Sequence, residues 1–238
     1  MNKFKQYLYD YFHQPNIVKR LIIMFLGVFF MGFFLSFLLN VNLGTDPYTF
    51  MNFTISGKIH WQFGTWQLLL NLLMFLLMLW KGRHLIGLGT LANMVLIGYV
   101  SDFFRWVWSI CIPDAYFTEA PGRYLIFGAA LLLFVVSAAF YMNSDVGISP
   151  YDAIPKMINE HLPKLPYFII RIAWDYLAVL IGYLCGGKAG IGVLIMAVAL
   201  GPAVSLVGKI FEPLFNSSEQ SVKDTKTENN QSCNFRQD

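Results

Sequence analysis

Long runs of apolar residues constrain this chain more than any other feature of its sequence. A helix needs ~20 apolar residues to cross a hydrocarbon core about 30 Å thick. The runs are continuously apolar and do not alternate, which excludes the strands of a membrane barrel. The sequence therefore predicts an all-α polytopic membrane protein with six transmembrane helices, near residues 20–40, 64–80, 85–107, 123–142, 167–184 and 189–209.

The composition favours a membrane protein over a soluble domain. Hydrophobic residues make up 56% of the 238 residues and charged residues only 13%, whereas about a quarter of a typical soluble domain is charged. No basic stripe is interleaved with aromatic residues, so we expect no nucleic-acid partner. Cys111, Cys185 and Cys233 form neither a CxxC pair nor a disulfide framework. We expect membrane lipids as partners, and neither a cofactor nor a metal.

The two ends of the chain differ from its middle. Residues 1–19 are polar and aromatic, and Phe4, Leu8 and Tyr11 or Phe12 fall on one helical face, which predicts a cytoplasmic interfacial segment. The first apolar run is too long for a secretory signal. Residues 216–238 are rich in Ser, Asn, Gln, Lys and Glu, which predicts a disordered cytoplasmic tail.

The distribution of Lys and Arg predicts the orientation of the chain in the membrane. With a cytoplasmic N-terminus, positive residues concentrate on the inner side, as the positive-inside rule requires. We therefore expect both termini in the cytoplasm of a bacterial cell with the protein in its inner membrane. Arg171 is not counted because it lies within a span. The inner residues are Lys3, Lys5, Lys19, Arg20, Lys81, Arg83, Lys156, Lys164, Lys209, Lys223, Lys226 and Arg236, and the outer ones are Lys58, Arg105, Arg123 and Lys188.

Two short stretches interrupt the apolar runs in the same way. They are NVNLGTDPYTF, from Asn40 to Phe50, and NSDVGISPYDA, from Asn143 to Ala153. The second copy of the glycine, Gly147, follows Gly44 by 103 residues, and the same offset places GLGT at 87–90 on GIGV at 190–193. An ordered set of matches predicts an internal repeat. The further matched pairs are Asn40 with Asn143, Asn42 with Asp145, Pro47 with Pro150, Tyr48 with Tyr151, Gly98 with Gly201, and, after a shift of one residue, Gln67 and Asn71 with Arg171 and Asp175.

Each copy contains three predicted spans. An odd number of spans turns the second copy over in the membrane, so the sequence predicts a 3+3 inverted repeat. The first repeat covers residues 20–108, an external loop covers 109–122, and the second repeat covers 123–215. The copies are not equivalent, because Ser149 replaces Asp46 and GYVSD lacks the Gly-Pro of GPAVS.

The two interruptions have the signals of a helix that stops and restarts. Gly44 and Gly147 can adopt the positive φ that ends a helix. Asp46 and Ser149 are favourable N-cap residues, each followed by a proline at the first helical position. The restarted helices, about 47–57 and 150–161, are too short to cross, so they either re-enter the membrane or lie at its interface. The breaks then line a solute path, or they are capped loops at the ends of spans one and four.

Arg171 and Asp175 are charged residues inside the fifth predicted span. A charge at the bilayer centre costs about 2.5–3.5 kcal/mol on insertion scales and normally faces a partner or a cavity. Their spacing of four puts both on one helical face. They either form an ion pair that fixes helix packing, or line a cavity in which Asp175 binds a cation or proton and Arg171 an anionic group.

The paired Gly-x-x-Pro breaks and the GLGT and GIGV spans resemble the YczE/YyaS/YitT group of bacterial integral membrane proteins. The resemblance covers roughly residues 20–210, and within the group the motifs are nearest to YczE. It implies an inner-membrane protein from a group whose biochemical activity is poorly defined. It supplies no catalytic residues.

The remaining motifs do not indicate catalysis. The sequence has no HExxH, GxSxG or Cys–His cluster, so we expect no enzyme. Asp102, Arg105, Trp106 and Trp108 are interpreted as anchors at the membrane interface. The glycine pairs at 87/89 and 190/192 are interpreted as close helix contacts.

The sequence thus predicts a small-solute permease that works as two inverted halves. The alternative is an accessory or regulatory membrane protein without transport activity. The solute would be polar or ionic, and the glycine-rich spans are compatible with a homodimer. The residues expected along the solute path are Asn40, Asn42, Gly44, Asp46, Pro47, Tyr48, Gln67, Asn71, Asn143, Asp145, Gly147, Ser149, Pro150, Tyr151, Asp152, Arg171 and Asp175.

Overall fold

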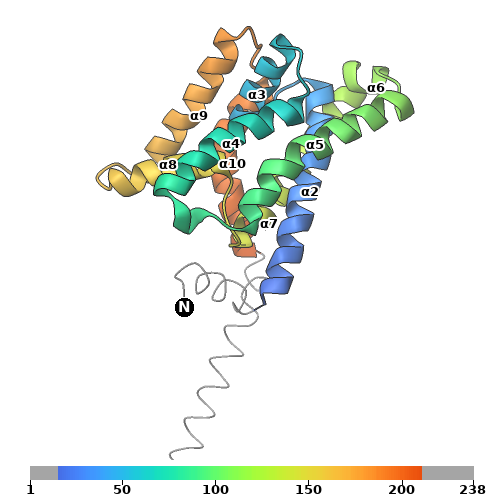
Figure 1. The fold of residues 1–238 in the computed structure, drawn as a ribbon. Coiled ribbons are helices and arrows are strands. Elements are labelled where there is room, and N and C mark those ends of the chain that lie inside the picture. Colours follow the sequence, from blue (N-terminus) through green and yellow to red (C-terminus); the bar gives the residue numbers. More distant parts are fainter. Residues whose placement is uncertain (1–15, 211–238) are drawn as a thin grey trace, which may run out of the picture.

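The computed structural model describes residues 16–210, apart from the side chains at 199, 200 and 203–205. Within this range the ordered elements are helices, which confirms the all-α prediction (Figure 1). The interfacial segment predicted for residues 1–19 falls almost entirely outside the described residues, and the tail predicted for 216–238 lies wholly outside them. The long helices are α2 (Ile17–Val41), α4 (Phe63–Lys81), α5 (Leu88–Cys111), α7 (Gly122–Asn143), α9 (Tyr167–Leu184) and α10 (Ile191–Ile210).

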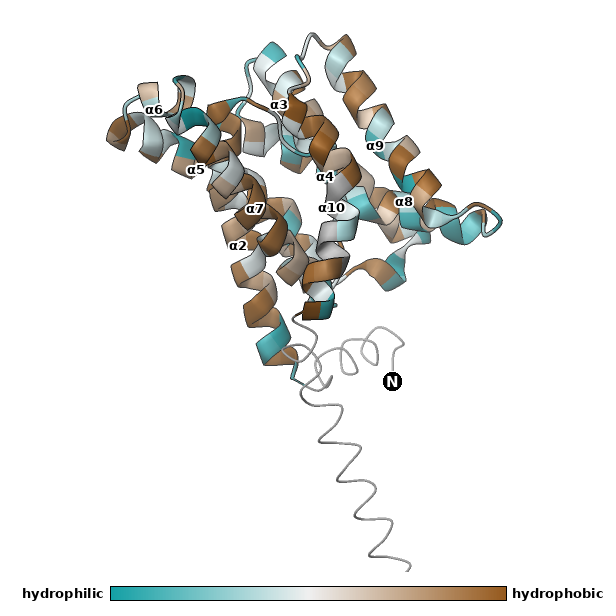
Figure 2. Cartoon of the chain, turned by 180° about the vertical axis from the view of Figure 1, so that it is seen from behind, coloured by the Kyte–Doolittle hydropathy of each residue, from teal (hydrophilic) through white to brown (hydrophobic). Residues whose placement is uncertain are grey.

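Five helices in the described part of the chain are long and apolar enough to cross a membrane: α2, α4, α5, α7 and α9. Their outer faces carry many exposed large apolar side chains, and Figure 2 shows long hydrophobic stretches along them. A soluble domain could not leave so much apolar surface in water. The five lie where the sequence predicts spans one to five. The 20-residue helix α10 begins and ends within a few residues of the sixth predicted run.

Short helices join the long ones. Two of them, α3 (Pro47–Lys58) and α8 (Pro150–His161), follow the two breaks and have nearly the predicted bounds. The others are the 3₁₀ turn η1 (Arg83–Leu85) and α6 (Ala115–Thr118). At 12 residues each, α3 and α8 are too short to cross a bilayer.

The backbone at both breaks follows the predicted stop-and-restart pattern. Gly44 and Gly147 have φ values of 117° and 110°, which side chains other than glycine rarely tolerate. The N-cap side chain of Asp46 accepts a hydrogen bond from the backbone N–H of Thr49 at 3.0 Å. The hydroxyl of Ser149 accepts one from Asp152 at 3.1 Å. The local sequence signals therefore predict the local structure correctly.

The helices form two buried clusters. In the first, α2 lies along α7 and α5, and a Cβ added to Gly27 would come within 2.8 Å of the backbone nitrogen of Tyr141. In the second, α3 and α8 lie together with α4 and α9. The short helices are exchanged between the predicted halves, because α3 packs mainly against α9 and α8 against α4 (Figure 1).

The glycine pairs at 87/89 and 190/192 contact the break loops. The N–H of Gly192 donates to the carbonyl of Leu43 at 3.0 Å, and the N–H of Gly89 donates to that of Val146 at 2.8 Å. A Cβ at position 87 or 190 would collide with these same loops. The prediction of close contacts is confirmed, but their partners are the break loops of the other predicted half and not helices.

Candidate functional site

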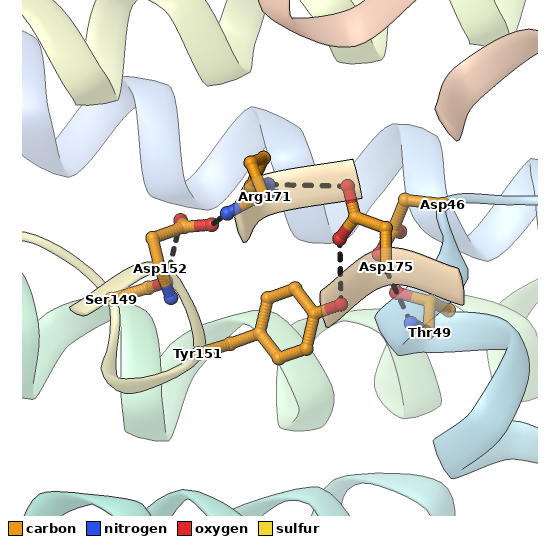
Figure 3. Close-up of polar contacts among 7 residues, drawn as sticks. All are labelled: Asp46, Thr49, Ser149, Tyr151, Asp152, Arg171 and Asp175. Atoms are coloured by element: carbon orange, nitrogen blue, oxygen red, sulfur yellow. Dashed lines mark hydrogen bonds and ion pairs between the residues drawn. The ribbon is translucent and has the colours of Figure 1, made fainter. Parts of the chain in front are cut away.

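A charged cluster joins α8 and α9. The Nε of Arg171 donates to Asp175 at 3.1 Å, and its terminal amine donates to Asp152 (Figure 3). Asp152 also accepts a hydrogen bond from the Ser149 hydroxyl at 2.6 Å. The ion pair considered for the fifth span is therefore present, and it includes a third charge contributed by α8. Arg171 is the one positive side chain of this cluster, and it is shared by two carboxylates.

Two stacked tyrosines connect this cluster to the first half. The rings of Tyr48 and Tyr151 lie 4.3 Å apart with an interplanar angle of 24°. The hydroxyl of Tyr151 donates to Asp175 at 2.7 Å, and the hydroxyl of Tyr48 donates to Asn71 at 2.7 Å. The guanidinium of Arg171 lies 5.2 Å from the ring centre of Tyr151. Side chains from α3, α4, α8 and α9 thus meet at one place.

Asp46 lies beside this meeting point, between the candidate spans α2 and α4. One of its carboxylate oxygens caps α3, and the other, Oδ2, is buried without a hydrogen-bond partner. Burial raises the pKa of the Asp46 carboxyl above its ordinary value; the hydrogen bonds from Thr49 oppose this rise, and the negative charge of Asp152 adds to it. The position matched to Asp46 in the second half is Ser149, which carries no charge.

Three further polar side chains are buried in the first half with unpaired atoms. Asn52 and Ser101 are 0% exposed and Gln67 is 3% exposed. The Oε1 of Gln67 and the Oγ of Ser101 have no hydrogen-bond partner, and the amide of Asn52, which lies close to the Tyr48 hydroxyl, makes no hydrogen bond of normal geometry. Buried polar groups without partners are rare in proteins. Sequence reasoning missed Asn52, although Asp46, Thr49, Asn52 and Ser56 recur at the helical spacing of three to four.

A cavity of about 580 Å³ opens at one end of the bundle, between the ends of α2, α3 and α5, the start of α4, and α6. Its wall includes Arg105, whose Nε donates to the Asn40 side chain at 3.1 Å and whose guanidinium lies 5.0 Å from the ring of Phe53. Asp102 lies 3.6 Å from Arg105 and accepts a hydrogen bond from the Gly64 N–H at 2.7 Å. The residues interpreted as interface anchors therefore line a cavity.

Some predicted path residues lie away from the cluster. Asn42 and Asp145 are exposed at the ends of α2 and α7, and the Asn143 side chain donates back to the carbonyl of Ala139 at 2.8 Å. Two arginines that the sequence analysis did not include among the path residues contact these ends. Arg123 donates to the carbonyl of Asn42 at 3.3 Å, and Arg20 lies 3.7 Å from Asp145. The two arginines are themselves 103 residues apart.

Comparison with known proteins gives a consistent result. The chain is 22% identical to the "Uncharacterized membrane protein YczE" of Bacillus subtilis over 191 residues, which cover 79% of this chain and 85% of that protein. It is 22% identical to the "Uncharacterized protein YyaS" of the same organism over 181 residues, 74% of this chain and 85% of YyaS. It is 26% identical to an uncharacterized protein of Haemophilus influenzae over 163 residues, 68% of this chain and 71% of that protein.

These matches confirm the resemblance to the YczE and YyaS proteins and agree with a multi-pass membrane protein. No solved structure matches the chain. The family described as "Family of unknown function (DUF6198)" matches residues 18–209, so this membrane protein belongs to that family.

Proposed function

We propose that the protein is a small-solute permease of the bacterial inner membrane, built from two inverted three-helix halves with α10 as the sixth span. Contacts that recur at the repeat offset of 103 residues support the inversion. The bond from Gly192 to Leu43 has its counterpart in the bond from Gly89 to Val146. The contact of Arg123 with Asn42 has its counterpart in that of Arg20 with Asp145. With three spans in each half, both termini lie in the cytoplasm, as the distribution of Lys and Arg indicates.

The observation that carries the transport proposal is the polar meeting point of α3, α4, α8 and α9. Tyr48 and Tyr151 stack there, with Asn71 on one side and the Arg171 cluster on the other. Gly/Pro-interrupted segments at matching places of two inverted halves are typical of transporter binding sites. The N-termini of α3 and α8 begin beside this point and contribute positive dipole ends.

A movement between the halves would change this meeting point. Alternating access in such folds is largely a rocking of one half against the other around a fixed site. The exchanged short helices link the halves, since α3 packs on α9 and α8 on α4. We therefore place the moving contact at the Tyr48–Tyr151 stack. We assign no catalytic step to any of these residues.

The second candidate is an accessory or regulatory membrane protein without transport activity. The observation in its favour is that Arg171 is paired on both sides within the bundle. In that case the cluster would fix helix packing, and the breaks would be ordinary capped loops.

Water access to the meeting point distinguishes the two candidates. In full-length protein with Cys111, Cys185 and Cys233 replaced by serine, Asp175→Cys or Asn71→Cys is exposed to a membrane-impermeant thiol reagent from each side of sealed vesicles. A permease predicts reaction from at least one side for one of the two positions. Ser137→Cys, at a buried position of α7, is the unreactive control. If neither position reacts from either side while the protein remains folded, the accessory role is the correct one.

A further inference from the structure

The interior of the first half contains hydrogen-bonding groups that the protein does not satisfy. Asn52 on α3, Gln67 on α4 and Ser101 on α5 are almost completely buried, and each has an unpaired side-chain atom. Leaving such a group without a partner costs folding free energy, while replacing it with an apolar group of the same shape does not. A membrane protein interior that retains three of them therefore indicates a molecule that pairs with them.

The helix register places these three groups in one region. The chain reverses between α3 and α4, because Phe53 packs on Phe63 while Tyr48 bonds to Asn71. One helical turn beyond Tyr48 is Asn52, and one turn before Asn71 is Gln67, so these two amides oppose each other. The face of α4 that carries Gln67 and Asn71 also meets α5, since a Cβ at Gly98 of α5 would lie 2.6 Å from the Cα of Gly64 and Asn71 donates to the carbonyl of Met94. Ser101 is the next residue on that face of α5.

The unpaired atoms define the chemistry of a ligand. They comprise one amide N–H₂ donor, two amide oxygen acceptors and one hydroxyl, and they carry no charge. The positive groups nearby are already paired, Arg171 with two carboxylates and Arg105 with Asp102, whereas the N-cap Asp46 keeps one buried carboxylate oxygen without a partner. An anion at this place would lose its hydration without gaining a counter-charge. An uncharged molecule with hydroxyl or amide groups satisfies both the donors and the acceptors.

The cavity at the end of the bundle provides the entrance. Ser56 and Phe63 line that cavity, and they lie one helical turn from Asn52 and Gln67 respectively. We propose that Asn52, Gln67 and Ser101 form a binding site for a small uncharged hydroxyl- or amide-bearing solute, entered from this cavity. The inference rests on the proposed permease function and specifies its substrate class.

A pair of buried serines gives a matched test of the site. Ser101 is unpaired, whereas the hydroxyl of Ser137 on α7 already donates to the carbonyl of Leu133 at 2.7 Å. In the cysteine-free protein, Ser101→Cys and Ser137→Cys are treated with the uncharged reagent methyl methanethiosulfonate. We expect Ser101→Cys to react and Ser137→Cys to remain unreactive. Acetamide and glycerol should slow the reaction of Ser101→Cys, whereas acetate, the charged analogue of acetamide, should not.

Variants of Asn52 and Gln67 measure the hydrogen bonds that these two residues contribute to the proposed site. Asn52→Leu or Gln67→Leu in the Ser101→Cys protein should weaken the protection by acetamide roughly fivefold to tenfold, the size of one hydrogen bond. Thermal unfolding shows that the variants are folded. Equal protection by acetate and acetamide would mean an ionic path, and absence of labelling or of protection by any uncharged solute would mean a sealed or merely water-filled interior. Each of these results overturns the inference.

A flux measurement separates this inference from the permease proposal. Vesicles containing the full chain are mixed with acetamide or glycerol, and their re-swelling is followed by light scattering. We expect re-swelling faster than in protein-free vesicles, with loss of the difference in Asn52→Leu. Protection of Ser101→Cys without any flux supports the binding site and contradicts the permease. Flux of acetate at the rate of acetamide contradicts the substrate class.

Discussion

Matched positions in the two predicted repeat copies carry different chemistry. In the first half, α3 and α4 meet through neutral groups, with a tyrosine hydroxyl bonded to Asn71. In the second half, α8 and α9 meet through charges, with the matched tyrosine bonded to Asp175 and Asp175 paired with Arg171. Asn52, whose amide is unpaired, is matched by Pro155, which is buried inside α8. The same backbone plan is thus fastened by ion pairs in one half, whereas the buried amide and serine groups without partners lie in the other.

The two halves also differ in how closely their second and third long helices pack together. In the first half, α4 and α5 are in close contact where Gly64 meets Gly98. The matched glycine of α10, Gly201, has no described atom within 4 Å of the position of its Cβ. Helix α9 therefore depends on α3 and α8 for much of its packing, and not on its sequence neighbour α10. The charged cluster therefore helps to hold α9 in place, a structural role that the neutral contacts between α3 and α4 do not have.

The largest expected effect comes from removing the central charge of the second half. Arg171→Leu leaves the buried Asp175 and the partly buried Asp152 without a counter-charge, which should cost up to about 3–5 kcal/mol of stability. Gln67→Leu removes the neutral residue at the matched position and should cost less than about 1 kcal/mol, since no buried charge loses its partner. Thermal unfolding of the purified protein measures both.

Neutralising the two carboxylates provides the control. Arg171→Leu combined with Asp152→Asn and Asp175→Asn should recover most of the lost stability, because no unpaired charge remains. If Arg171→Leu alone unfolds at the same temperature as the unaltered protein, the cluster does not fasten the second half.

The two stacked tyrosines allow a second comparison. Tyr151→Phe removes a hydrogen bond to a carboxylate and should cost about 1.5–3 kcal/mol, whereas Tyr48→Phe removes one to an amide and should cost about 0.5–1.5 kcal/mol. Both variants keep the ring stack. Denaturant or thermal unfolding of the two variants side by side checks the order. A larger loss of stability in Tyr48→Phe would show that the bond to the neutral amide contributes more than the bond to the carboxylate, which contradicts this comparison.

The glycines that contact the break loops test the similarity of the halves. Gly87→Ala and Gly190→Ala each place a methyl group against a carbonyl oxygen of the opposite break loop, and overpacking of this kind costs about 1–3 kcal/mol. We expect similar losses of stability in the two variants. Gly128→Ala in α7 meets no atom within 4 Å and serves as the harmless control. Unequal losses in the two loop-contacting variants would show that the halves dock differently.

The smallest expected effect is a gain. Asn52→Leu removes an amide whose two polar atoms are buried without partners, so stability should stay the same or rise by about 1 kcal/mol. The matched variant Pro155→Leu, which involves no unpaired side-chain group, measures the baseline for a substitution at this place in the second half. A clear loss of stability in Asn52→Leu would mean that the amide is satisfied within the protein.

The local features of this fold could be predicted from the sequence. Continuous apolar runs and the stop-and-restart signals around Gly44 and Gly147 act over a few residues, so five candidate spans and both short helices appear where expected. The ion pair of Arg171 with Asp175 follows from helical spacing. These signals depend on neighbours in the chain and need no knowledge of tertiary contacts.

Contacts between distant segments could not be predicted in the same way. The pairing of Asp152 with Arg171 depends on how α8 lies against α9. The unpaired state of Asn52 depends on what α4 and α5 place around it, and a single asparagine in a helix gives no signal of this. The cavity likewise forms from five separate elements.

The central claim is that the two halves are inverted, and the break ends themselves test it most directly. Asn42 and Asp145 occupy matched positions and are both exposed, so a thiol reagent in water can reach cysteines placed there. With an impermeant thiol reagent applied to intact cells and to inside-out vesicles, Asn42→Cys should react only from the outer side and Asp145→Cys only from the cytoplasmic side. Reaction of both positions from the same side would contradict the inverted architecture.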